Sequence, residues 1–151
     1  MTSSRIILPI LGVAVWSGLC FWAGLSSARE PAATADVLLS TSQTIIGQPI
    51  SYPTQTPAKV TAAIITMPPG AKTGWHVHEV PLFAYMLEGT LKVDYGAQGQ
   101  RVYKKGDSFM EAIRAPHDGE NMGPEPVKVL AVFIGADGLK NTVKIKPPQS
   151  P

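Results

Sequence analysis

The chain has only three histidines: His76 and His78, separated by one residue, and His117 further along the sequence. Side chains of a β-strand alternate between its two faces, so residues at i and i+2 project to the same side. A neutral imidazole offers a ring-nitrogen lone pair near physiological pH, which makes histidine the commonest metal-binding side chain. His76 and His78 therefore predict two ligands of one metal site, and His117 is the candidate that completes it.

Two glutamates are candidates for a further ligand. Glu79 follows His78 directly, so in a regular strand its side chain should face away from that of His78, unless Pro81 introduces a bulge. Glu111 lies on the predicted strand that leads to His117, and we expect it to approach the metal directly or through water. The third alternative is a face of three histidines, with the other positions open to water or substrate.

The elements that must position these residues are strands. Short β-branched and aromatic runs alternate with Gly- and Pro-containing breaks from Val37 onward, and none has an apolar 3.6-residue period long enough for a helix. Strands at a spacing of about ten residues are typical of an all-β sandwich or barrel. The predicted strands are residues 59–67, 82–87, 90–95, 108–112 and 127–134, with a last one near Val143.

The N-terminal segment, residues 1–28, predicts a signal peptide. Residues 6–25 are almost wholly apolar, Arg5 is the only charged residue before Arg29, and Ser26-Ser27-Ala28 supplies the small residues that a signal peptidase recognises. The alternative is an uncleaved membrane anchor, because the apolar run is about long enough to span a bilayer. In both cases we expect the folded part to be periplasmic or secreted.

The predicted organisation after the leader is a single domain. Residues 29–36 read as a flexible lead-in, 37–136 as the domain, and 137–151 as a final strand and a C-terminal tail. The whole chain has a net charge of +2, which is too balanced to indicate a nucleic-acid partner. The only cysteine, Cys20, lies in the leader, so the mature protein would have neither a disulfide nor a thiolate metal ligand.

The spacing of the glycines and histidines resembles the two sequence motifs of the cupin family. The first motif is a glycine, five residues, H-x-H, a glutamate and a glycine; the second is a glycine, a proline, a glycine, a histidine and an asparagine. The matching positions are Gly70, His76, His78, Gly89, Gly106, His117 and Asn121. The resemblance covers roughly residues 37–134 and implies an all-β jelly-roll barrel that holds a metal inside through its histidines.

The sequence also departs from these motifs. The family's usual glutamate ligand would fall near Leu82, where there is no carboxylate, and Ala112 and Arg114 replace the proline and glycine of the second motif. Asn121 is a candidate partner that would orient His117 through a hydrogen bond, with a role in a turn as the alternative. Residues 75–89 are similar to a subgroup of small bacterial cupins, many of them exported. The resemblance further implies a homodimer.

The predicted function is that of an exported cupin with one divalent metal at His76, His78 and His117; Fe(II), Mn(II), Ni(II) and Zn(II) all suit such ligands. One hypothesis is a mononuclear enzyme of the Fe(II) dioxygenase or isomerase type, acting on a small organic molecule. Glu111 would then be a ligand or general base, and Tyr85 a candidate acid. The alternative is a non-catalytic module that captures a small ligand, such as a sugar or organic acid, at the metal.

Overall fold

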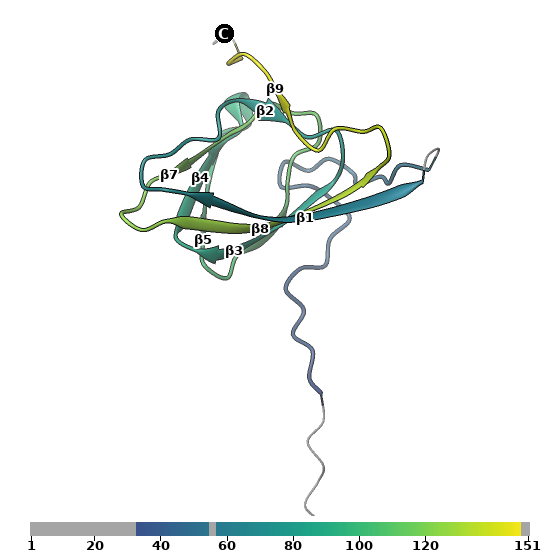
Figure 1. Ribbon diagram of the computed structural model, residues 1–151, viewed down its shortest axis with the longest axis horizontal. Coiled ribbons are helices and arrows are strands. Elements are labelled where there is room, and N and C mark those ends of the chain that lie inside the picture. Colours follow the sequence, from purple (N-terminus) through teal and green to yellow (C-terminus); the bar gives the residue numbers. More distant parts are fainter. Residues whose placement is uncertain (1–32, 55–56, 149–151) are drawn as a thin grey trace, which may run out of the picture. The chain divides into compact units, whose positions relative to one another are not determined.

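The computed structural model describes residues 33–54 and 57–148 (Figure 1). The chain divides into two units, Met1–Thr34 and Ala35–Pro151, and every strand described below belongs to the second. The predicted leader, residues 1–28, lies outside the described residues, as does the lead-in up to residue 32. In the described ranges there is no helix of the length and hydropathy that a membrane crossing requires.

Two antiparallel sheets make up the body of the second unit (Figure 1). The larger has the strand order β1 (Ala58–Met67), β8 (Val127–Ala136), β3 (Leu82–Glu88) and β6 (Ser108–Met110). The smaller has the order β5 (Gln100–Lys104), β4 (Thr90–Asp94) and β7 (Asp118–Asn121). A short ribbon of β2 (His76–Val77) and β9 (Val143–Lys144) lies beside them, and a 3-10 turn, η1 (Gly96–Gln98), links β4 to β5.

Alternating burial defines the inner faces of the sheets. Along β3 and β8 every second side chain is buried, as expected for strands with one face on the core. The antiparallel register pairs Ala84 with Ala131 and Met86 with Val129, so the inward side chains of the two strands meet. The predicted all-β jelly-roll class is therefore confirmed.

The first-motif glycine, Gly89, is required by packing where β3 turns into β4. Its φ is +78°, in the region that favours glycine. A Cβ at this position would lie 2.7 Å from the carbonyl oxygen of Pro126 and 2.9 Å from Cα of Val127. Any other residue would force the chain away from the start of β8.

The predicted strands correspond to β1, β3, β4, β6 and β8, and the expected last strand corresponds to β9. The strands β5 and β7 were not predicted from the sequence. The strand β7 reads Asp-Gly-Glu-Asn, residue types that are depleted in strands, and it forms because its neighbour β4 offers a full ladder of partners.

Candidate metal centre

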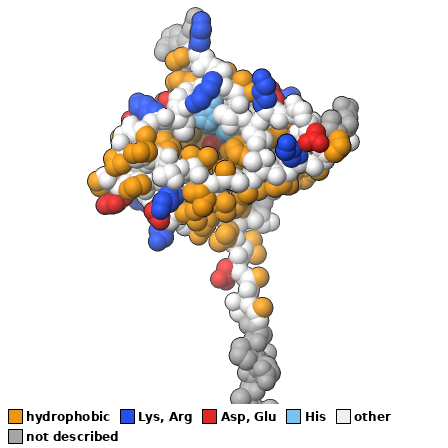
Figure 2. Space-filling view, viewed as in Figure 1, with side chains coloured by type: hydrophobic (Ala, Val, Ile, Leu, Met, Phe, Trp, Pro, Cys, Tyr) orange, Lys and Arg blue, Asp and Glu red, His pale blue; other side chains and the backbone are white. Residues whose placement is uncertain are grey.

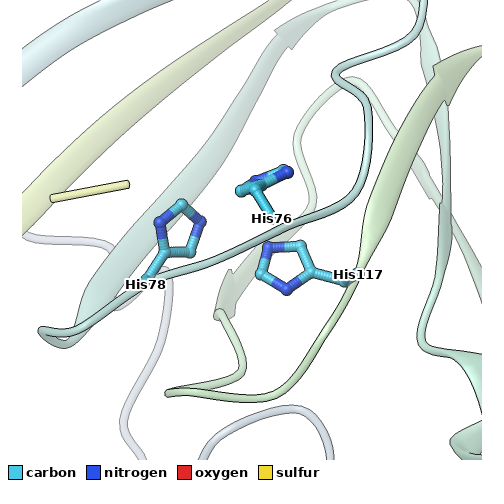
Figure 3. Close-up of side chains that lie close together, drawn as sticks. All are labelled: His76, His78 and His117. Atoms are coloured by element: carbon cyan, nitrogen blue, oxygen red, sulfur yellow. The ribbon is translucent and has the colours of Figure 1, made fainter. Parts of the chain in front are cut away.

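The three histidines meet at one end of the barrel interior. His76 begins β2, His78 follows that strand, and His117 precedes β7. The backbones of His76 and His117 are joined by two N–H to carbonyl hydrogen bonds of 3.0 Å each. Figure 3 shows the three imidazoles facing a common space, and the ring centroids lie 4.3–5.0 Å apart.

Each imidazole is oriented by a hydrogen bond from Nδ1 to a backbone carbonyl. His76 Nδ1 lies 2.7 Å from the oxygen of Gly74, and His78 Nδ1 lies 2.7 Å from that of Asn141. His117 Nδ1 lies 2.9 Å from the oxygen of Ala115. A carbonyl only accepts, so each Nδ1 carries the proton and each Nε2 keeps its lone pair. Carbonyl contacts of this kind fix the tautomer of metal-binding histidines in general.

One of these lone pairs lacks any partner. Among the described residues, Nε2 of His117 is the buried side-chain polar atom without a hydrogen bond. Leaving a buried acceptor unpaired costs about 1–3 kcal/mol, so such an atom calls for an explanation. The ligand atoms of the three histidines lie within 4.8 Å of one another. A metal at about 2.1 Å from each nitrogen would draw these atoms closer together and would satisfy His117.

Burial keeps the three rings neutral. Desolvation lowers the pKa of His76 and of His117 below the ordinary value of 6.5. Desolvation and the nearby His117 lower the pKa of His78 to about 3. Neutral imidazole is the form that binds metals, so the site is prepared for a cation at neutral pH.

Glu111 supplies a carboxylate close to the three rings. It is buried, its Oε1 accepts a 2.7 Å hydrogen bond from the N–H of Ala112, and its Oε2 lies 3.9 Å from Nε2 of His117. Burial raises the pKa of Glu111 to about 7, while the Ala112 N–H and the hydroxyl of Tyr95 oppose this rise. The group can therefore hold or release a proton near neutral pH, or serve as an anionic neighbour to a bound cation.

Tyr95, which the sequence did not indicate as a site residue, is buried behind this carboxylate. Its ring centroid lies 5.8 Å from that of His117, and its hydroxyl lies 3.1 Å from the hydroxyl of Tyr103. Burial, and then the charge of Glu111, raise the pKa of Tyr95 well above its ordinary value, so it stays protonated. Its parity with the buried Leu91 and Val93 of β4 is the signal that could have identified it.

A cavity of about 190 Å³ lies against the histidines and Glu111. Figure 2 shows histidine side chains inside a hollow of the surface. Most of the wall is apolar, and the polar groups of the wall other than the histidines and Glu111 are Thr73, Thr142 and Lys144. The apolar wall comprises Ile65, Met67, Leu82, Ala84, Leu91, Val93, Phe109, Gly119, Val129, Ala131 and Phe133.

Three expected site residues lie elsewhere. Tyr85, the candidate acid, is not among the residues that line the cavity, because its β3 neighbours Ala84 and Met86 take the inward positions. Glu79 lines a separate surface hollow, and its carboxylate accepts a 2.8 Å hydrogen bond from the N–H of Lys140. Asn121 bonds to backbone groups of Met67, Gly123 and Glu125, so its contacts belong to a turn and not to His117.

Comparison with known proteins agrees with this architecture. Residues 63–133 match the family model described as the cupin domain. The chain therefore carries a cupin domain at residues 63–133, as its motifs indicated. A search among curated proteins finds no significant match.

Two solved structures illustrate the likeness. The oxalate decarboxylase of Lactobacillus farciminis, in a formate complex, is 26% identical with a TM-score of 0.50, over 57% of this chain and 26% of that chain. The chain thus spans about a quarter of that relative. An uncharacterized protein with a double-stranded β-helix domain from Klebsiella pneumoniae is 17% identical with a TM-score of 0.50, over 64% of this chain and 86% of that chain. The second likeness concerns the fold alone.

Proposed function

We propose that the protein is a mononuclear metal-binding cupin that takes a small organic molecule at one divalent ion. The observation that carries this proposal is the convergence of three Nε2 lone pairs, each fixed by a carbonyl on Nδ1, with His117 Nε2 otherwise unpartnered. A bound ion would supply a Lewis acid with open positions for a ligand and, if it is Fe(II), for O₂. Fe(II), Mn(II), Ni(II) and Zn(II) all suit this donor set.

For the reaction, we favour an enzyme of the dioxygenase or isomerase type. Glu111 lies in the cavity wall with a pKa raised to about 7, which suits a group that accepts or donates a proton near neutral pH. The apolar wall would exclude water around the bound molecule and strengthen electrostatic contacts to it. The resemblance of part of the chain to an oxalate decarboxylase supports chemistry on a small acid.

The alternative is a non-catalytic module that captures a small ligand at the metal. The displacement of Tyr85 from the cavity favours it, because Glu111 is then the only carboxyl or phenol group among the described residues of the wall. Turnover in a screen with and without O₂ would support the enzyme, whereas ligand-induced stabilisation without product would support the module.

Elemental analysis tests the metal. The mature protein, purified without added metal or chelator, should contain about one equivalent of a divalent ion that the double variant His76→Ala/His78→Ala lacks. Iron would favour the oxygenase; zinc, manganese or nickel would favour non-redox chemistry or capture. A wild-type protein that neither retains nor takes up any of these metals would disprove the proposal.

We also propose that the protein is exported and pairs as a homodimer. Export follows from the leader predicted in residues 1–28, and sequencing of the secreted N-terminus tests it. For pairing, β1 lies at the edge of its sheet, and its large apolar side chains Val60 and Ile64 are 65% and 61% exposed. An edge strand with exposed apolar side chains is a template for a second strand. A monomer in sedimentation equilibrium would contradict the pairing.

A further inference from the structure

A single lysine lies in the wall of the cavity. Among the residues that line it, Lys144 is the only lysine or arginine. It belongs to β9, where it pairs directly with His76 of β2. Directly paired residues of an antiparallel ladder project to the same face, so the register directs Lys144 towards the space that His76 enters.

The charge of Lys144 is available to a ligand. In the part of the chain that the structure describes, Lys144 forms no ion pair with a carboxylate. Its Nζ donates one hydrogen bond to the backbone oxygen of Thr73, which leaves donors of the ammonium group free. The residue is exposed, so the charge lies at the mouth of the cavity.

Two other residues of the segment 141–144, which contains Lys144, also contribute to the site. Asn141 accepts the hydrogen bond that orients His78, and the hydroxyl of Thr142 lies 3.3 Å from Nδ1 of that ring and lines the cavity. Residues 141–144 lie beyond residues 63–133, which match the cupin domain. Lys144 therefore comes from outside the matched region.

We propose that Lys144 makes the cavity selective for a small organic carboxylate, whose charged end it binds at the mouth while the apolar body lies against the wall. The inference rests on the proposed function, because it names the ligand class of the same site. A charge-assisted hydrogen bond from an ammonium to a carboxylate is stronger than a neutral one. The apolar wall then favours acids with a short or branched alkyl chain over sugars, because sugar hydroxyls would find few hydrogen-bond partners there. The volume of about 190 Å³ suits a small ligand.

Calorimetry with acetate, propionate and isobutyrate, each beside its neutral amide, tests the proposal on the protein with its metal content measured. The wild-type protein should bind at least one acid more tightly than its amide. Lys144→Met keeps the apolar stem and removes the charge, so the dissociation constant of that acid should rise at least about tenfold. The amide should bind equally to both proteins. Lys144→Arg should bind the acid within a few-fold of wild type.

The matched control is Lys146→Met, the same change of charge two residues further on and outside the cavity wall. It should leave acid binding unchanged. The proposal is overturned if no acid binds, if acids and amides bind alike, or if Lys144→Met and Lys146→Met behave the same. If the protein lacks metal but binds acids through Lys144, the carboxylate site stands and the metal proposal fails. If the metal is stoichiometric and acid binding does not depend on Lys144, the metal proposal stands and the carboxylate site at Lys144 fails.

Discussion

The two ends of the inner face of β3 and β8 differ in how they are filled. At one end, Met86 and Val127 are fully buried in a cluster of apolar side chains, and neither lines the cavity. At the other end, Leu82 and Phe133 border the cavity of about 190 Å³. The packed end gains stability from close contacts, as protein interiors generally do.

The hollow end forms a site, and the polar groups buried there reduce the stability of the fold. Three imidazoles are held there without charge, one of them with an unpaired Nε2, and a carboxyl group is buried beside them. Buried polar groups of this kind are costly unless they find partners. The comparison indicates that the same strands supply folding free energy at one end and a binding site at the other.

The largest expected effect concerns packing. Met86→Ala removes a fully buried side chain from the packed end and should reduce the free energy of unfolding by about 3 kcal/mol. Leu82→Ala removes a side chain of the same strand and face that already borders a cavity. It therefore has fewer contacts to lose and should cost about half as much. Urea denaturation of both variants measures the difference, and equal losses would mean that the two ends are packed alike.

The next effect concerns the carboxylate of the hollow end. Glu111→Gln keeps the shape of the side chain but removes its charge, so metal affinity should fall about 10–100-fold, the range found when groups around a metal are altered. Glu79→Gln is the control, because that carboxylate faces a different hollow. A competition titration with a chelator measures both. Unchanged affinity in Glu111→Gln would favour a centre of three histidines alone.

A smaller effect concerns pH. In the metal-free protein the folded pKa values of the histidines lie below 6.5, that of His78 at about 3, so the unfolded chain binds more protons below pH 6.5. Their contribution to stability is present above pH 6.5 and is lost as pH falls towards 3. Glu111 acts in the opposite direction: its folded pKa of about 7 exceeds 4.5, so its contribution is lost as pH rises through 7.

On acidification from pH 7 to about pH 5 the three histidines lower the stability and Glu111 raises it. Because three groups act against one, we expect a net loss of stability over this range. Thermal melts of the metal-free protein should show a midpoint that falls over this range. The double variant His76→Ala/His78→Ala should fall by much less. A midpoint that rises as the wild-type protein is acidified would mean that the burial of Glu111 outweighs that of the histidines.

Part of the fold and of the site could be predicted from the sequence alone. The motif spacing led to the fold and to His76, His78 and His117, because i and i+2 positions share a face and turn glycines such as Gly89 fix the chain path. The parity of β3 could not be predicted, since large and mainly hydrophobic side chains occupy both sets of positions, Phe83 and Tyr85 in one and Leu82 and Met86 in the other. Periodicity states that side chains alternate but not which set faces inward when both sets are apolar.

Other parts depend on contacts that are distant in sequence. The pairing of His76 with Lys144 and the hydrogen bond from His78 to Asn141 both join β2 and its following turn to the C-terminal segment. That segment reads as a final strand and tail, and nothing in its composition places it at the histidines. The rim of the cavity could therefore be described only once the structure was known.

The smallest effect tests whether Tyr95, and not Tyr85, is the tyrosine of the site. Tyr95→Phe removes a buried hydroxyl, leaves that of Tyr103 without its 3.1 Å partner, and should cost about 1 kcal/mol of stability. Tyr85→Phe changes a half-buried tyrosine outside the cavity wall and should stay within about 0.5 kcal/mol of wild type. If the protein is an enzyme, Tyr95→Phe should also shift the pH profile of turnover, because its hydroxyl helps to lower the pKa of Glu111. If the pH profile shifts with Tyr85→Phe instead, Tyr85 would again be the candidate acid. That result would contradict the assignment of Ala84 and Met86 to the inner face of β3.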